Sequence, residues 1–150
     1  MYKIKLTARA KKELHNGMST IHPIPGMKHI LAELKKLHVH MGIVSSNSID
    51  NINKFLENHS LHIFDFIHPT SKIWSKNTSL KNLIIQKGYR LEDILYVGDE
   101  IRDIVAAKKL GIKVAAVTWG YNSAQSLKKH KPHYLIENPE NLLTLCQKFI

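Results

Sequence analysis

The residues of this sequence most suited to chemistry are two aspartates that follow a short apolar run. Residues 94–97 are Ile, Leu, Tyr and Val, a composition that predicts a strand covered on both faces of a sheet. Asp99 follows this strand, and the helical spacing of the next apolar residues places Asp103 in the first turn of a helix. Both carboxylates can then reach one point beyond the carboxyl end of the strand, where open α/β sheets bind ligands. Paired carboxylates at such a point predict a metal site.

Polar side chains also lie beside other predicted elements. Ser46 and Asn47 come shortly after the apolar pair Ile43 and Val44, and Lys76 stands just before the expected start of a helix. A phosphate group binds hydroxyl groups, backbone N–H groups and a lysine ammonium, while Mg²⁺ held by carboxylates neutralises the remaining charge. In a parallel sheet these groups would converge with the two aspartates. Taken singly, a Ser-Ser-Asn run is usually a helix cap and a loop lysine is usually solvated.

Helical and strand patterns alternate from Met27 to the C-terminus. The predicted helices cover residues 27–37, 49–56, 80–86, 101–110 and a last segment after Asn138, and the predicted strands cover residues 39–44, 64–67, 94–97, 114–117 and 134–136. Regular alternation predicts an α/β fold with a parallel sheet and helices on both faces. Residues 1–22 fit either a helix or a half-exposed strand, so we separate them from a domain of residues 23–150.

The composition, 43% apolar and 23% charged over 150 residues, is typical of one globular domain. No apolar run approaches the roughly 18 residues that span a bilayer, and the N-terminus lacks the apolar core of a signal peptide. We therefore expect a cytoplasmic protein with no membrane partner. The single cysteine, Cys146, lies on an apolar helix stripe and is expected to pack as a small hydrophobic residue.

The formal net charge of +10 raises the question of a nucleic-acid partner. The lysines are scattered over all the predicted helices, and aromatic residues do not interleave with a basic stripe, so we expect no nucleic-acid partner. The densest basic cluster is residues 128–133. A positive field would equally steer a small anionic substrate such as a phosphate ester toward the protein.

In this order and spacing, these motifs resemble the haloacid dehalogenase (HAD) superfamily of hydrolases, in particular its phosphoglycolate-phosphatase-like branch. The resemblance runs from about Ile24 to the C-terminus. Residues 42–47 resemble the second motif of the family, Lys76 resembles the lysine of the third, and residues 98–103 resemble the fourth, metal-binding motif. Residues 117–123 match the strand and loop that come after it.

The resemblance implies a three-layer, Rossmann-like core in residues 23–150 and a remnant of a cap-domain helix in residues 1–22. It also implies a small phosphorylated substrate or phosphate as ligand and Mg²⁺ as cofactor. The implied phosphate-binding residues are Ser46, Asn47 and Lys76, of which Lys76 is also catalytic, and the implied metal ligands are Asp99 and Asp103.

One motif of the family is missing. The nucleophile of the family is the first Asp of an Asp-x-Asp-x-Thr motif that ends the first, central strand, and no such motif occurs here. The other aspartates, Asp50, Asp65 and Asp93, are expected to be helix caps or surface charges. The chain thus resembles the C-terminal part of a Mg²⁺-dependent phosphate monoester hydrolase, inactive alone and lacking a third carboxylate at its metal site. The alternative is a non-catalytic pseudoenzyme that binds phosphate or a protein partner.

Loss of the central strand leaves a gap between the predicted strands 39–44 and 94–97. Neighbouring strands lie about 4.8 Å apart, so these two would be about 10 Å apart with an unpaired edge on each. Residues 2–7 could fill the gap, but their lysines would face a layer covered by helices. We therefore expect either direct pairing of the two strands or completion of the sheet by another chain, in a homodimer or with a different partner.

Overall fold

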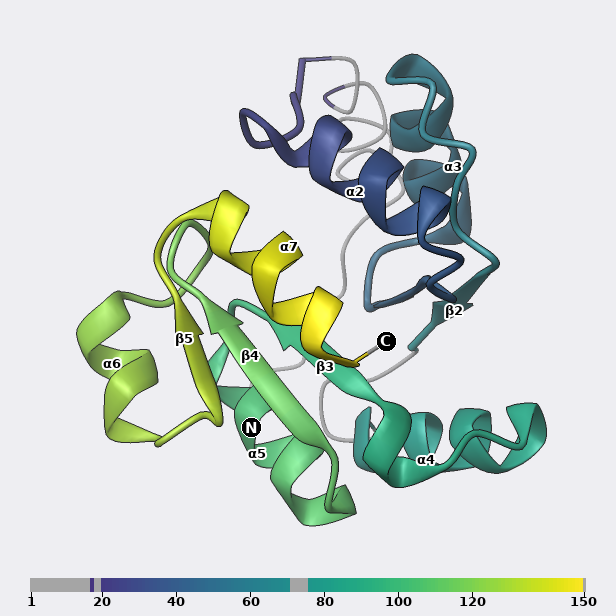
Figure 1. Ribbon diagram of the computed structural model, residues 1–150. Coiled ribbons are helices and arrows are strands. Elements are labelled where there is room, and N and C mark those ends of the chain that lie inside the picture. The colour runs from purple at the N-terminus through teal and green to yellow at the C-terminus, as the bar shows by residue number, and fades with distance from the viewer. Residues whose placement is uncertain (1–16, 18–19, 71–75, 150) are drawn as a thin grey trace.

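A computed structural model describes residues 17, 20–70 and 76–149, in which helices and strands alternate (Figure 1). The helices are α2 (Met27–Lys36), α3 (Ile49–Asn58), α4 (Lys76–Lys87), α5 (Ile101–Leu110), α6 (Ala124–Lys129) and α7 (Pro139–Cys146), with short 3₁₀ turns at Leu91–Asp93 and Gln147–Phe149. The strands are β1 (Gly42–Ser45), β2 (Phe66–Pro69), β3 (Leu95–Gly98), β4 (Lys113–Val117) and β5 (Tyr134–Ile136). The predicted cap remnant, residues 1–22, lies almost entirely outside the described residues.

The strands form the middle of three layers, as β4 shows most clearly. Successive side chains of a strand point to opposite faces of its sheet. Val114 and Ala116 pack into a buried cluster with residues of α4 and α5, whereas Ala115 and Val117 pack into a second cluster with Leu142 of α7. The helices therefore cover both faces of the sheet, and the predicted α/β fold is confirmed.

The same two helical layers extend over β1 and β2. Val44 of β1 and Phe66 of β2 pack against the cluster that holds α4 and α5. Ile43 and Ile67 point to the opposite face and pack against buried residues of α3. On that face α2 also contacts α7, where Cys146 packs against the buried residues of α2. Cys146 is therefore a packed apolar side chain, as predicted, and its burial raises the pKa of its thiol.

The strands form two sheets, not one. β1 pairs with β2, and β3, β4 and β5 pair in that order, with every pair parallel. Within the described part of the chain no strand pairing joins β1 to β3. Of the two alternatives expected from the sequence, direct pairing of these two strands is therefore wrong. Helical packing connects the two sheets instead: one buried cluster of α4 and α5 contains Tyr96 of β3 and contacts Val44 of β1, and on the other face α2 contacts α7.

The first strand begins later than predicted, at Gly42 instead of residue 39. His38 has a left-handed backbone conformation, with φ of 57°. The N–H of Val39 then donates to the carbonyl of Leu34 at 3.1 Å, so residues 38 and 39 form the turn that closes α2 at its C-terminal end. The apolar character of Val39 serves helix packing, because this residue contacts the buried cluster around Ile30.

Two helices also differ from the sequence prediction. α4 begins at Lys76, four residues before the predicted start at Leu80, so Lys76 lies in the first turn of the helix and not in a loop before it. α6 was not predicted. It is a short helix whose N-cap, Ser123, accepts a hydrogen bond from the N–H of Ser126 at 3.3 Å.

Asp65 joins the end of α2 to the entry of β1. One carboxylate oxygen accepts a hydrogen bond from the Lys35 ammonium at 2.7 Å, and the other accepts one from the N–H of Met41 at 2.8 Å. These two donors, the lysine first, hold the pKa of Asp65 below its usual value of 3.8. The side chain is only 26% exposed, so solvent screens the contact in part. Asp65 therefore has a structural role, as the acidic partner of Lys35 in an ion pair.

We expect Asp65→Asn to lower the free energy of unfolding by about 1 kcal/mol at pH 7, because it removes a charge-assisted hydrogen bond and an ion pair. A carboxyl group with a lowered pKa in the folded state stabilises the fold above its unfolded pKa and loses that contribution as the pH falls through the folded value. The difference between wild type and variant in urea denaturation should therefore shrink as the pH falls below 3.8 and the Asp65 carboxylate of the folded state becomes protonated. A difference that stays constant as the pH falls would contradict this account.

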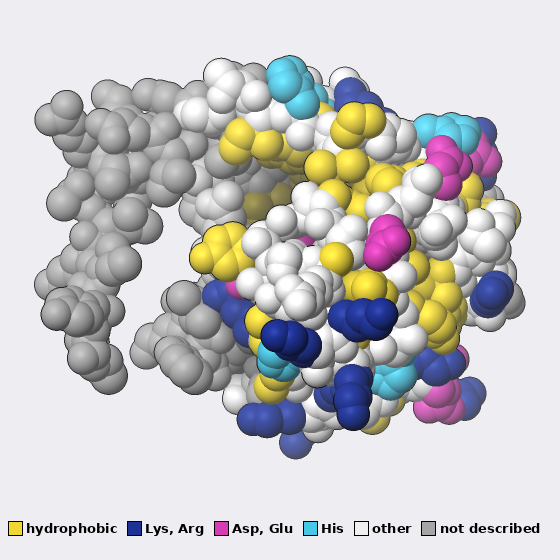
Figure 2. All heavy atoms as spheres, turned by 90° about the vertical axis from the view of Figure 1, so that its left-hand side faces the viewer, with side chains coloured by type: hydrophobic (Ala, Val, Ile, Leu, Met, Phe, Trp, Pro, Cys, Tyr) yellow, Lys and Arg dark blue, Asp and Glu magenta, His cyan; other side chains and the backbone are white. Residues whose placement is uncertain are grey.

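The surface carries dispersed positive charge. Figure 2 shows the side of the molecule that bears α6, where lysine and arginine side chains lie mainly in the lower half, separated by neutral side chains. No helix among residues 20–70 and 76–149 is long and apolar enough to cross a bilayer. The expectation of no nucleic-acid partner stays a prediction.

Candidate metal and phosphate site

The turn from β3 into α5 carries the predicted metal ligands. β3 ends at Gly98, and α5 begins at Ile101 after the extended N-cap residue Glu100. Asp103 lies in the first turn, where its carboxylate accepts a hydrogen bond from the N–H of Glu100 at 3.2 Å. A carboxylate in this position satisfies a backbone donor that the helix cannot satisfy, and it interacts favourably with the helix dipole. Asp103 thus stabilises the start of α5.

Asp103 is buried, with 3% of its surface exposed. The hydroxyl group of Tyr96, on β3, donates to its other carboxylate oxygen at 3.3 Å. Burial, and secondly the neighbouring Asp103 charge, raise the pKa of Tyr96, so this hydroxyl group remains protonated and available as a donor. Strand β3 and helix α5 are therefore joined through one buried carboxylate, which fixes the direction in which the helix leaves the strand.

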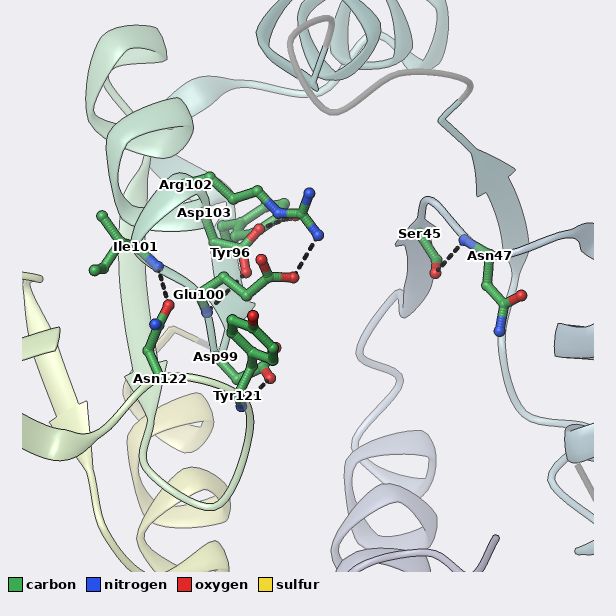
Figure 3. Close-up of polar contacts among 10 residues, drawn as sticks. All are labelled: Ser45, Asn47, Tyr96, Asp99, Glu100, Ile101, Arg102, Asp103, Tyr121 and Asn122. Carbon is green, nitrogen blue, oxygen red and sulfur yellow. Dashed lines mark hydrogen bonds and ion pairs between the residues drawn. The ribbon is translucent and has the colours of Figure 1, made fainter. Parts of the chain in front are cut away.

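Asp99 is held by the loop that follows β4 (Figure 3). Its carboxylate accepts a hydrogen bond from the N–H of Tyr121 at 2.6 Å, and its carbonyl accepts one from the N–H of Asn122 at 3.1 Å. The Asn122 side chain in turn accepts the N–H of Ile101 at 2.9 Å. A side chain at Gly120 would overlap the Asp99 carboxylate, so the close approach of this loop requires glycine.

Glu100 supplies a third carboxylate that the sequence analysis did not include. One oxygen from each of Asp99, Glu100 and Asp103 lies within 4.8 Å of the other two. Glu100 also forms an ion pair with Arg102 at 2.5 Å. Mg²⁺ prefers a few carboxylate oxygens and completes its octahedral shell with water, so this group of oxygens fits the ion that the family implies. The spacing of residues in the sequence did not indicate Glu100, because its place beside Asp99 and Asp103 depends on the extended backbone of the N-cap residue.

The predicted phosphate-binding residues lie in the turn between β1 and α3. The Ser45 hydroxyl accepts a hydrogen bond from the N–H of Asn47 at 3.1 Å, and the side-chain Oδ1 of Asn47 accepts one from the N–H of Ser48 at 2.9 Å. Ser48, and not Ser46, caps α3 by accepting the N–H of Asn51 at 3.2 Å. Ser46 is exposed. The turn is therefore ordered by its own side chains, which leaves the Ser46 hydroxyl facing solvent.

The acidic group and this turn lie opposite each other, at the carboxyl ends of β3 and β1. In Figure 3 the side chains of Glu100 and Arg102 extend toward Ser45 and Asn47 across the space between the two strands. Among the residues that the structure describes, no hydrogen bond joins the two groups. The side chain of Lys76 lies outside the described part of the chain. The structure thus brings the carboxylates together, while the phosphate-binding roles of Ser46, Asn47 and Lys76 stay predictions.

The family profile of haloacid dehalogenase-like hydrolases matches residues 2–117, which is most of the chain. The chain belongs to this family. Phosphoglycolate phosphatase of Synechococcus elongatus is 36% identical over 140 residues, a match that covers 93% of this chain and 66% of the relative. Pyrophosphatase PpaX of Bacillus velezensis is 31% identical over 121 residues, covering 75% of this chain and 54% of the relative. The chain thus spans less than two thirds of these relatives.

Solved structures of HAD hydrolases share the fold. A haloacid dehalogenase-like hydrolase from Streptococcus pneumoniae superposes with a TM-score of 0.77 at 22% identity, covering 86% of this chain and 62% of that protein. A HAD family hydrolase from Deinococcus radiodurans also reaches 0.77, at 15% identity, covering 93% of this chain and 66% of that protein. The predicted Rossmann-like HAD core is confirmed, in a chain that matches part of a longer fold.

We expect Gly120→Ala to weaken Mg²⁺ binding about tenfold, because the added methyl group displaces the Asp99 carboxylate from its position under the loop. Titration calorimetry of the wild-type and variant chains measures the affinity, and circular dichroism checks that both are folded. Wild-type Mg²⁺ affinity in a folded variant would show that the contact of the loop with Asp99 does not position a ligand.

We expect Tyr96→Phe to lower the free energy of unfolding by about 1–2 kcal/mol, because the buried Asp103 carboxylate loses a hydrogen-bond donor. Urea denaturation at pH 7 measures the change. Tyr121→Phe is a matched control, since Tyr121 is 82% exposed and its hydrogen bond to Asp99 comes from the backbone N–H, which the substitution keeps. Equal stability of wild type and Tyr96→Phe would mean that the hydroxyl contributes nothing to the buried site.

Proposed function

We propose that this chain is the metal- and phosphate-binding part of a Mg²⁺-dependent phosphate monoester hydrolase, and that it is inactive alone. The observation that carries the proposal is the group of three carboxylates at the carboxyl end of β3, in a chain of the HAD-like hydrolase family. Bound there, Mg²⁺ would neutralise charge on a phosphate group. Inactivity is proposed because the sequence contains no Asp-x-Asp-x-Thr motif to supply a nucleophile.

The proposed metal ligands follow β3, whereas two of the proposed phosphate-binding residues follow β1. Asp99 and Asp103 are the proposed metal ligands, and Glu100 completes the set of carboxylates. Ser46 and Asn47 would donate a hydroxyl and an amide hydrogen bond to phosphate oxygens, and Lys76 would provide a positive charge close to the transferred group. Asp103 also has a structural role. The Tyr96 hydroxyl of β3 donates a hydrogen bond to its buried carboxylate, which holds the start of α5 against the strand.

The substrate is proposed to be a small phosphorylated molecule. The relatives are a phosphoglycolate phosphatase and a pyrophosphatase, which makes phosphoglycolate and pyrophosphate the first two compounds to test. The net charge of +10 supports an anionic substrate, because a positive field raises its rate of encounter.

The non-catalytic pseudoenzyme remains the second candidate. The absence of an Asp-x-Asp-x-Thr motif in a chain that keeps a group of carboxylates favours it. Both candidates predict binding of Mg²⁺ and phosphate by this chain. They differ in what a longer chain with an added Asp-x-Asp strand would do, because only the hydrolase proposal predicts that such a chain releases phosphate.

We expect the 150-residue chain to bind Mg²⁺ in titration calorimetry and to release no phosphate from 4-nitrophenyl phosphate. Asp99→Asn should weaken Mg²⁺ binding at least about tenfold, because it removes a charged ligand. Asp93→Asn is the matched control, since Asp93 lies in the exposed 3₁₀ turn before β3 and its side chain is 67% exposed.

Absence of Mg²⁺ binding, or equal weakening in both variants, would contradict the proposed metal site. Phosphate release that disappears in Asp99→Asn would instead show that this chain contains a nucleophile, and the proposal of inactivity would be wrong.

A further inference from the structure

Arg102 lies beside the three carboxylates, in the first turn of α5. Its Nη2 donates a hydrogen bond to Oε1 of Glu100 at 2.5 Å, and its side chain is 30% exposed. In Figure 3 the guanidinium extends toward Ser45 and Asn47, across the space between β3 and β1. The positive group therefore lies between the carboxylates and the turn that carries two of the proposed phosphate-binding residues.

The ion pair with Glu100 uses only half of one edge of the guanidinium. A carboxylate or phosphate group that fits this edge accepts two parallel hydrogen bonds, one from Nε and one from Nη2. Glu100 accepts the Nη2 donor, whereas Nε is buried and has no hydrogen-bond partner within the part of the chain that the structure describes. A buried donor without a partner lowers the stability of the arrangement that contains it. Glu100 is therefore a poor match for this edge of Arg102, and an anion that accepts from both nitrogens would fit it better.

Glu100 lies between Arg102 and the proposed metal site. One of its oxygens lies within 4.8 Å of an oxygen of Asp99 and of Asp103. Mg²⁺ in that position would attract the Glu100 carboxylate more strongly than a partly exposed guanidinium does, because its charge is twice as large. Metal binding would then weaken the ion pair and leave the guanidinium without its present anion.

The turn opposite Arg102 suits an anion. Residues 45–49 are Ser, Ser, Asn, Ser and Ile, which carry no charge, and they lead into the ten-residue helix α3. The first N–H groups of a helix and the positive end of its dipole attract phosphate. Ser46 is exposed, and so is Asp50, the acidic residue in the first turn of α3. An oxyanion placed here would have the start of α3 on one side and the guanidinium on the other.

We propose that Arg102 binds the phosphate group of the ligand through Nε and Nη2, and that it exchanges Glu100 for this phosphate when Mg²⁺ binds. The inference rests on the proposed function, because it places the phosphate between the carboxylates and the Ser46 turn. A simpler role for Arg102 would be to neutralise Glu100 and hold the acidic group together. In that role any positive charge at this position would serve, and phosphate would not contact the guanidinium.

The two ligands should respond in opposite directions to Arg102→Gln. In titration calorimetry of the full chain saturated with Mg²⁺, the variant should bind inorganic phosphate at least about tenfold more weakly, because two charge-assisted hydrogen bonds are lost. Without phosphate, it should bind Mg²⁺ about twofold more tightly, because Glu100 loses a competing cation. Arg102→Lys should weaken phosphate binding about fivefold although it keeps the charge, because an ammonium group cannot form the two parallel hydrogen bonds.

Lys109→Gln is the matched control. Lys109 is exposed at the other end of α5, and its replacement changes the net charge by the same amount. It should change phosphate binding by less than about twofold, since salt screens a distant surface charge. A site-specific signal comes from the ¹H–¹⁵N resonance of Arg102 Nε, which is assigned by its absence in Arg102→Lys. This resonance should shift when phosphate is added to the Mg²⁺-saturated chain.

Three results would overturn the inference. The first is wild-type phosphate affinity in Arg102→Lys, or equal weakening in Arg102→Gln and Lys109→Gln, which would mean that only charge matters. The second is weaker binding of both Mg²⁺ and phosphate in Arg102→Gln, which would mean that Arg102 only holds the carboxylates in place. The third is a wild-type chain that binds Mg²⁺ but not millimolar phosphate. In all three the wild-type chain still binds Mg²⁺, so the proposed metal site stands; a wild-type chain that binds neither ligand would refute the proposed function as well.

Discussion

The arrangement of the site depends on one buried carboxylate. Asp103 is buried at the junction of β3 and α5, and the hydrogen bonds that Tyr96 and the N–H of Glu100 donate to it make a buried carboxylate tolerable there. These hydrogen bonds fix the exit of the helix from the strand. As a result Asp99 and Glu100, which occupy the turn between them, have little freedom. The loop after β4 then holds Asp99 from the other side through the N–H of Tyr121.

The second constraint is the covering of both sheets by common helical layers. Because α2 contacts α7 on one face and one cluster joins α4 and α5 to both sheets on the other, β1 and β3 keep their separation without hydrogen bonds between them. Packed interiors resist rearrangement more strongly than a few unpaired backbone groups can drive it. This separation places the Ser46 turn and the carboxylates on opposite sides of one space, a geometry suited to a ligand that both sides contact.

Much of the architecture could be predicted from the sequence. The apolar run before Asp99 and the helical spacing after it predicted the positions of β3 and α5 well, because Tyr96 and Ile104 are buried where the pattern indicates. The second face of β3 is less covered than predicted, since Val97 is 42% exposed. Local hydrogen bonds were harder to predict. Because of the turn at His38, β1 begins at Gly42, and the Ser123 cap stabilises the start of α6. Both depend on local hydrogen bonds that the spacing of apolar residues does not reveal. Glu100 was missed because its role depends on the backbone angles of an N-cap. Direct pairing of β1 with β3 was expected from unpaired strand edges alone. The helices that pack on both faces of the two sheets, which a strand pattern does not report, keep the strands apart.

The central claim is that Asp99, Glu100 and Asp103 hold a divalent ion opposite the Ser46 turn. Line broadening by Mn²⁺, an ion with similar preference for oxygen ligands, tests it most directly in ¹H–¹⁵N spectra of the full chain. The account predicts the strongest broadening at the amides of Asp99, Glu100 and Tyr121, and weaker broadening at Ser46 and Asn47. Broadening centred on other acidic residues, such as Glu92 and Asp93, or no selective broadening at all, would contradict it.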